Sequence, residues 1–226
     1  MKLKILAFDT STDWCSVALS YGDEIIVMEN NATKRHNELI LPMIDEVLRK
    51  AQLKLAQLDA IAFGCGPGSF TGIRLATSIA QGLAFGANLP LIPVSTLRIL
   101  AQTAHDKFAV SQAIVLLDAH MNQVYCGVYR AENDLMVNVV DDFVSTPTNL
   151  ALPEQCKNWP GLGNGWSIYA DKLRQLSARD TLKEELYPDG RSLIALAIDA
   201  YRRGQTLSPL MISPAYLSGN ELYHRL

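Results

Sequence analysis

Hydrophobic and polar positions along the chain form short apolar runs separated by longer helical stripes, as expected of an α/β protein. Strands are expected where four to seven apolar residues stand together, and helices where apolar residues recur every three or four positions. The first half is expected to contain three strands, a helix, a strand, a helix, a strand and a helix. The strands are expected at 3–9, 15–20, 25–29, 60–63 and 91–94, and the helices at 36–51, 70–88 and 95–105.

The second half of the chain begins with a sequence pattern that also occurs at the start of the first half. Residues 114–118 (IVLLD) and 124–129 repeat the order seen at 5–9 (ILAFD) and 15–19, in which an apolar run ends in aspartate and a polar turn leads to a second apolar run. This repeat predicts two related lobes. Their expected limits are 1–105 and 106–226.

The rest of the second lobe is less regular. Prolines and glycines in 149–166 predict mostly loop. A helix is expected at 192–203 and is expected to end at Gly204. Sequence order places this helix in the second lobe, and packing back on the first lobe is the alternative.

A glycine-rich stretch, GCGPGSFTGIR at 64–74, precedes the second helix. It lacks the lysine of a Walker loop and the glycine spacing of a dinucleotide fingerprint. The amides of the helix N-terminus would still attract an anion. The simpler interpretation is that Gly66 and Gly68 adopt backbone angles unsuited to other residues, while Ser69 or Thr71 caps the helix. The residues favour this second interpretation.

Composition and charge argue against several classes of protein. The 226 residues are 49% hydrophobic and 19% charged, a composition that favours a folded core over disorder. The net charge of -3 disfavours binding of nucleic acid by this chain alone, because phosphate groups are neutralised by a basic surface. No apolar run reaches the roughly 18 residues of a membrane span, and Asp9 interrupts the N-terminal run too early for a signal peptide. Four cysteines without a CxxC pair indicate reduced thiols. We therefore expect a cytoplasmic protein without a membrane segment.

Four motifs together carry a family resemblance. They are DTST at 9–12, HNEL at 36–39 with Leu41-Pro42, GCGPGSFTGIR at 64–74, and DAHMN at 118–122 with Val124-Tyr125. Over roughly residues 1–130 the chain resembles the bacterial TsaB (YeaZ) family of tRNA threonylcarbamoyladenosine biosynthesis proteins. The resemblance implies the actin-like (ribonuclease H-like) fold, with two related lobes whose mixed sheets are flanked by helices.

The resemblance also implies partners and a function. Members of this family are expected to act with a homologous catalytic subunit, TsaD, and an ATPase, TsaE. Together these proteins transfer threonylcarbamoyl from threonylcarbamoyl-AMP to N6 of adenosine 37 in tRNAs that read codons beginning with adenine. The chain would contact tRNA only through the complex and would form a homodimer when alone.

The residues give little support for catalysis by this chain alone. Its four histidines include no pair spaced like the HxxxH metal ligands that the resemblance attributes to the catalytic relative, and HExxH and GxSxG are also absent. We expect no catalytic residue, no metal and no tightly bound cofactor. A nucleotide is expected only at the interface of the complex. The predicted role is that of a non-catalytic scaffold subunit.

The alternative function is an independent actin-like ATPase or small-molecule kinase. The turn after residue 9 lies where such enzymes place a phosphate hairpin, and an aspartate there can hold magnesium through water. This turn lacks the glycine and the basic residue that usually meet phosphates. The candidate anion or nucleotide contacts are Asp9, Ser11, Ser69 and Thr71.

The helices at 36–51 and 70–88 are the candidate partner surface. Small residues recur every fourth position from Gly72 to Ala84, which would let another backbone come close, and the first helix has more apolar residues than one core stripe needs. The second helix also carries Arg74 and Phe85, and arginine and aromatic residues are typical of interfaces. The resemblance implies that these helices contact the catalytic relative or a second copy. The predicted interface residues are Leu41, Ile44, Leu48, Arg74, Thr77, Gln81 and Phe85.

Overall fold

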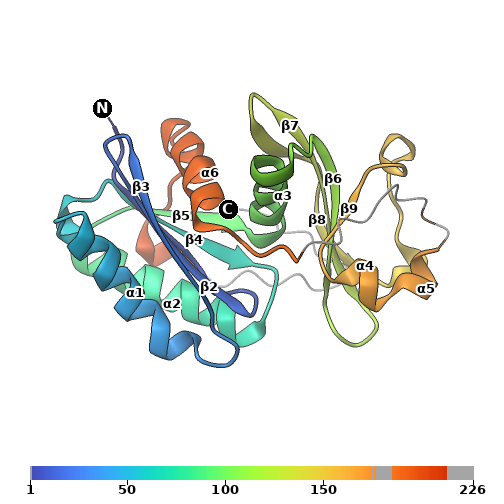
Figure 1. Cartoon of the computed structure of the whole chain (residues 1–226), viewed down its shortest axis with the longest axis horizontal. Coiled ribbons are helices and arrows are strands. Elements are labelled where there is room, and N and C mark those ends of the chain that lie inside the picture. The colour runs from blue at the N-terminus through green and yellow to red at the C-terminus, as the bar shows by residue number, and fades with distance from the viewer. Residues whose placement is uncertain (1, 175, 177–184, 213–226) are drawn as a thin grey trace. The chain divides into compact units, whose positions relative to one another are not determined.

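The computed structural model describes residues 2–174, 176 and 185–212 (Figure 1). The chain folds as two compact units. The first consists of the described parts of 1–99 and 188–215, and the second lies within 100–187. Helix α3, Thr96–Phe108, begins in the first unit and continues into the second.

The first unit is built on a five-stranded sheet with the order β3-β2-β1-β4-β5. Its strands are β1 Ile5–Asp9, β2 Trp14–Tyr21, β3 Glu24–Asn31, β4 Ala60–Gly66 and β5 Leu91–Ser95. Strands β1 to β3 are antiparallel neighbours, whereas β4 is parallel to both β1 and β5. The sheet is therefore mixed.

Helices cover both faces of this sheet. Helices α1 (His36–Lys50) and α2 (Phe70–Ala87) pack on one face, where Phe8 and Val17 join their core, and α6 (Gly190–Arg202) packs on the other (Figure 1). Successive strand residues point to opposite faces, so Ala18 faces α6, where Gly190 approaches it. Helix α6 thus belongs to the first unit.

The predicted helix starts and stops are close to those observed. Helix α2 begins after Ser69, whose hydroxyl accepts from the Gly72 amide, and α6 begins after Asp189, whose carboxylate accepts from the Arg191 amide. Gly204, with φ +71°, follows the end of α6 as predicted. Short 3-10 turns complete the irregular segments: η1 Leu55–Gln57, η2 Pro147–Asn149, η3 Glu154–Cys156 and η4 Pro209–Met211.

The second unit contains a four-stranded sheet with the order β8-β7-β6-β9. Its strands are β6 Gln112–Asp118, β7 Val124–Glu132, β8 Leu135–Ser145 and β9 Gly161–Leu162, and two short helices follow, α4 Gly165–Ile168 and α5 Ala170–Leu173. Strands β6, β7 and β8 are antiparallel neighbours and β9 is parallel to β6. This order repeats that of β3-β2-β1-β4, so the repeated pattern in the sequence reflects a repeated topology. The predicted fold, with two mixed sheets flanked by helices, is confirmed.

Strand β8 was not expected from the sequence. It begins after a two-residue turn at Asn133 and Asp134, both with positive φ, as in a type I′ hairpin. Most of its side chains are only partly buried, and its sequence, LMVNVVDDFVS, contains apolar runs of only two or three residues, too short to predict a strand. In the part of the chain that the structure describes, no helix combines the length and apolarity needed to cross a membrane.

Candidate functional site

The turn after β1 is the first candidate site, and the polar groups of Asp9 and Ser11 in it are buried and bonded to each other. The Ser11 amide and hydroxyl both donate to Asp9 Oδ1, at 2.8 and 2.7 Å. The Thr96 hydroxyl donates to Ser11 Oγ at 3.0 Å. These three residues are almost completely buried. The turn is therefore an internal hydrogen-bonded cluster of the first unit.

The glycine-rich loop between β4 and α2 packs directly on this turn. A Cβ on Gly64 would lie 1.7 Å from Asp9 Oδ2, one on Gly68 2.4 Å from the Ser11 carbonyl oxygen, and one on Gly72 1.9 Å from the Thr10 carbonyl oxygen. The Thr10 hydroxyl donates to the Gly72 carbonyl oxygen at 2.7 Å. The glycines at every fourth position thus allow the loop to cover the turn.

This packing refines the expectation for the loop. Gly66 has φ +105°, as expected, but Gly68 is not in the left-handed region, so that part of the expectation is wrong. Gly68 is required because the Ser11 backbone approaches it. Ser69 caps α2 and its amide donates to the Ser11 carbonyl oxygen at 2.7 Å. Its side chain and that of Thr71 are exposed. The structure therefore separates two buried candidate anion contacts from two at the surface.

Burial dominates the electrostatics of the turn. It raises the pKa of Asp9 from 3.8 to about 6, although the two hydrogen bonds from Ser11 act to lower it. Asp9 Oδ2 is buried and has no hydrogen-bond partner among the described residues. Burial and the nearby Asp9 raise the pKa of Cys15 to about 12, so this thiol stays protonated at neutral pH.

The second candidate site is the outer surface of α1 and α2. Leu41 is half exposed, Phe85 is 67% exposed, and Leu48 is partly buried. The Arg74 guanidinium stacks on Phe70, with its central carbon 3.1 Å from the ring centroid. Apolar and cationic groups therefore lie on the outer side of these helices, together with the exposed carboxylates of Glu38 and Asp45 on α1.

Other predicted interface residues lie inside the unit. Ile44 is in the core, and the buried Thr77 hydroxyl donates to the Ile73 carbonyl oxygen at 2.8 Å. The stripe of small residues from Gly72 to Ala84 is also buried, so the backbone that it admits is that of its own chain. Gly82 and Gly86 are exposed, and an added Cβ at either position would meet no heavy atom of the described residues within 4 Å.

The turn after β6, Asp118–Asn122, is the counterpart of the turn after β1. Asp118 Oδ1 accepts from the His120 amide at 3.0 Å and from the Tyr169 hydroxyl at 2.7 Å. His120 Nδ1 lies 3.1 Å from Asp118 Oδ2. His120, Met121 and Asn122 all have positive φ, and Met121 is 95% exposed. This turn projects its side chains to the surface.

Comparison with known proteins identifies the family of the chain. A family model described as "TsaD: tRNA N6-adenosine threonylcarbamoyltransferase" matches residues 27–169. The chain is 37% identical to the tRNA threonylcarbamoyladenosine biosynthesis protein TsaB of Haemophilus influenzae, over 99% of this chain and 97% of that protein. The chain belongs to the TsaB (YeaZ) family. TsaB of Escherichia coli is 34% identical, over 99% and 98% of the two chains.

Solved structures agree with this assignment to the TsaB family. YeaZ from Pseudomonas aeruginosa superposes with a TM-score of 0.88 at 36% identity, covering 95% of this chain and all of that one. The resemblance drawn from the sequence motifs is confirmed. The fold is the actin-like fold of this family.

One predicted interface residue of this TsaB-family chain has an unexpected partner. The Gln81 side-chain amide donates to the Pro209 carbonyl oxygen of η4 at 2.8 Å, across 128 positions in the sequence. Leu210 and Met211 follow on η4 and are both exposed. Sequence reasoning missed these two residues because no periodic pattern marks a three-residue turn.

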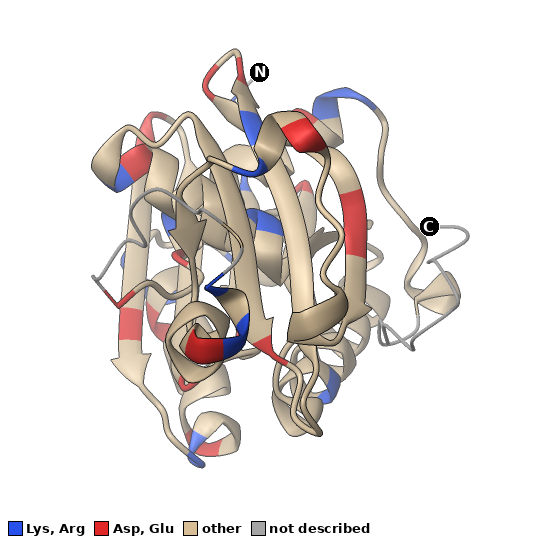
Figure 2. Ribbon diagram, turned by 90° about the vertical axis from the view of Figure 1, so that its right-hand side faces the viewer, with Lys and Arg blue, Asp and Glu red and all other residues tan. Residues whose placement is uncertain are grey.

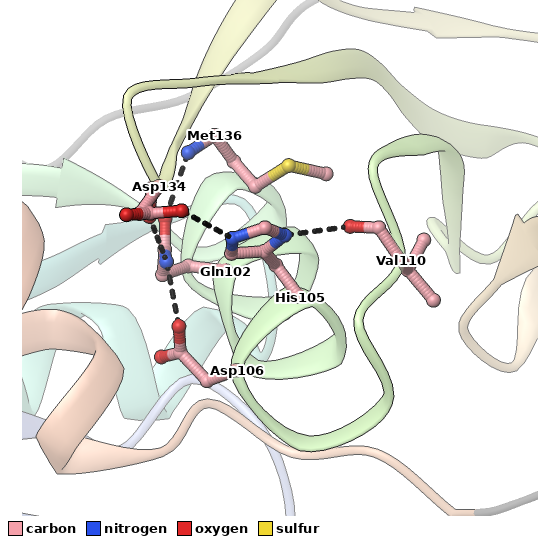
Figure 3. Close-up of polar contacts among 6 residues, drawn as sticks. All are labelled: Gln102, His105, Asp106, Val110, Asp134 and Met136. Carbon is pink, nitrogen blue, oxygen red and sulfur yellow. Dashed lines mark hydrogen bonds and ion pairs between the residues drawn. The ribbon is translucent and has the colours of Figure 1, made fainter.

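The histidine nearest the end of α3 has a structural role in this TsaB-family chain (Figure 3). His105 Nδ1 lies 2.9 Å from the Val110 carbonyl oxygen, and its Nε2 lies 4.0 Å from the Asp134 carboxylate. Buried Gln102 donates to the Asp134 carbonyl oxygen at 3.0 Å and accepts from the Met136 amide at 2.8 Å. These contacts fix the β7–β8 turn to α3. Within residues 2–174, 176 and 185–212, no three His, Cys, Asp or Glu residues are grouped to hold a metal ion.

Proposed function

We propose that the protein is a non-catalytic subunit of tRNA threonylcarbamoyladenosine biosynthesis that stabilises and positions a TsaD-family catalytic subunit. The observation that carries this proposal is the packing of the glycine-rich loop onto the turn after β1. Actin-like enzymes use this turn for phosphate, but here Asp9 and Ser11 bond to each other beneath Gly64 and Gly68. The first unit thus uses the turn for its own stability.

The proposed partner surface is the outer side of α1 and α2. The TsaD family model matches 27–169, a region that contains both helices, so a TsaD-family chain carries an equivalent pair. Residues 75–87 of α2 include no charged side chain. Exposed Phe85 lies among them, between the open positions Gly82 and Gly86. An uncharged face with an aromatic anchor and small neighbours suits close packing against another helix pair.

The proposal also includes a second copy of the chain, TsaE and tRNA. A second copy of the chain would occupy the same surface in a homodimer, and TsaE would supply ATPase activity to the assembled complex. Acidic and basic residues are interspersed along the ribbon in Figure 2, and the net charge is -3. A phosphate backbone requires a basic surface, so we assign tRNA contact to the complex. We propose no tightly bound cofactor, and a nucleotide only at the junction between subunits.

The proposal is tested by measuring association with the TsaD homologue of the same organism, with and without TsaE. We expect Phe85→Ser and Leu41→Ser to weaken the complex about tenfold or more, because exposed apolar anchors often carry most of the binding energy. Reconstituted formation of threonylcarbamoyladenosine should fall in parallel. Ile168→Ser, a similarly exposed residue on α4, is the matched control and should leave binding unchanged.

Two results would contradict the proposal. One is full tRNA modification by the TsaD homologue and TsaE in the absence of this chain. The other is hydrolysis of magnesium-ATP by the purified chain at an enzymatic rate, which would favour the independent ATPase or kinase.

A further inference from the structure

The segment after α6 returns to α2 along the edge of the first sheet. The Leu91 amide donates to the Leu207 carbonyl oxygen at 2.9 Å, and the Leu207 amide donates to the Leu91 carbonyl oxygen at 2.8 Å. These bonds hold the segment against the edge strand β5. The chain then forms η4, where the Met211 amide donates to the Ser208 carbonyl oxygen at 2.9 Å. The segment is therefore held in place before it reaches α2.

Two large apolar side chains of η4 point away from the core. Leu210 is 78% exposed and Met211 is 72% exposed, although η4 packs on α2 and its Pro209 carbonyl oxygen accepts from Gln81. Phe85 lies one helical turn beyond Gln81 on the same face of α2. We call Phe85, Leu210 and Met211 the α2–η4 patch. Large exposed apolar groups gathered on one surface are typical of an interaction site.

We propose that the α2–η4 patch is the part of the docking surface that selects the TsaD-family subunit, and that Gln81 is the residue that positions η4 in it. This inference rests on the proposed function. The patch continues the uncharged surface of α2, so it suits an apolar contact rather than a charged one.

The family match separates η4 from the helix pair. Residues 27–169 include α1 and α2 but end before η4. The helix pair is therefore common to TsaD-family chains and this chain, whereas η4 is outside the shared region. An element outside the shared region is able to distinguish an unlike partner from a second copy of the same chain.

The first experiment compares two variants of the full chain. Leu210→Ser combined with Met211→Ser is expected to weaken binding of the TsaD homologue about tenfold or more, while the homodimer constant, measured by sedimentation, changes less than about threefold. Both residues are exposed, so the melting temperature should stay unchanged. Phe85→Ser tests the α2 surface itself, and Ile168→Ser is the control.

The outcomes separate this inference from the proposed function. If Phe85→Ser weakens the heterocomplex and the η4 variant does not, the inference is overturned and the proposed function stands. If neither variant weakens it, the α1–α2 surface is also wrong as the docking site. If the η4 variant disrupts the homodimer and spares the heterocomplex, the patch belongs to a second copy and the inference is again overturned.

The positioning role of Gln81 is tested by Gln81→Met. Methionine keeps the length of the side chain but cannot donate to the Pro209 carbonyl oxygen. We expect about threefold to tenfold weaker binding of the TsaD homologue in the otherwise unaltered chain. In the Leu210→Ser/Met211→Ser background the same change should have no further effect, because there is no patch left to position. Additive effects in the two backgrounds would overturn the role of Gln81.

Discussion

The turns after β1 and after β6 have the same place in their respective sheets, yet one is buried and the other exposed. Asp9 and Ser11 in the first turn are covered by the glycine-rich loop. In the second unit, the corresponding loop after β9 also contains glycines, but Gly163 and Gly165 pack against Leu116 of β6 rather than against the turn. The repeated topology therefore fixes where a turn lies, and the glycine positions decide whether it is covered.

The unfavourable energy in each turn also has a different origin. In the first, the cost is a buried carboxylate with one unbonded oxygen at Asp9. In the second, the aspartate has hydrogen-bond partners, and the cost lies in the backbone, where His120, Met121 and Asn122 adopt positive φ. A covered turn suits an internal support, whereas an exposed one keeps its side chains available at the surface.

The largest effect on this contrast is expected from Gly72→Ala. The new Cβ would lie 1.9 Å from the Thr10 carbonyl oxygen, a backbone atom that cannot move away without displacing the turn. We expect a loss of about 3 kcal/mol in the free energy of unfolding of the first unit. Native-state hydrogen exchange of the β1 amides measures it for this unit alone.

The matched control for Gly72→Ala is Gly82→Ala, ten residues further along α2. An added Cβ at Gly82 meets no described heavy atom within 4 Å, and alanine favours the helix, so stability should rise by about 1 kcal/mol. Equal effects of the two substitutions would show that the loop does not depend on close packing against the turn.

Asp9→Asn is expected to have the next largest effect, and one that depends on pH. The folded pKa of about 6 lies above the ordinary 3.8, so the folded state binds the proton more tightly than the unfolded chain. The cost of the buried charge is present above pH 6 and is relieved as the pH falls through that value. Asparagine should therefore stabilise the first unit by up to about 3 kcal/mol at pH 8, and the gain should shrink towards pH 5.

The pH dependence is measured by urea unfolding of both proteins across pH 5–8. Ser11→Ala sharpens the test, because loss of the Ser11 hydroxyl removes a hydrogen bond that lowers the pKa of Asp9. The pH window should then move upward. A gain from Asp9→Asn that is constant across this range would contradict a buried, titrating carboxylate.

The long helices and the repeated sheets are the features that the sequence predicts well. Long periodic segments such as α1, α2 and α6 are found within one or two residues of their expected limits, because each has one strongly apolar face. The repeated strand–aspartate–turn–strand pattern correctly predicts two related sheets. Strand β8 was missed because polar residues divide its apolar residues into runs of only two or three.

The candidate site was less predictable because it depends on contacts between distant segments. The pattern at 64–74 indicates that glycines are needed, but only the folded chain shows that Gly64 and Gly72 accommodate residues of another turn. Small residues such as Ala80 have the same periodicity whether they face their own sheet or a partner. The bond between Gln81 and Pro209 joins two positions whose local sequences give no sign of contact.

The smallest expected effects come from two substitutions at positions of positive φ, one that relieves backbone strain in the second unit and one that introduces it in the first. Met121→Gly should stabilise the second unit by less than about 1 kcal/mol, because glycine removes the cost of positive φ at an exposed position but increases the entropy of the unfolded chain. Gly22→Ala is the reverse change in the β2–β3 turn, where φ is +62° and an added Cβ meets no described heavy atom within 4 Å. It should destabilise the first unit by a similar amount. Hydrogen exchange of the β6–β7 and β2–β3 amides measures the two effects separately, and a loss of stability on Met121→Gly would mean that the Met121 side chain supports the exposed turn.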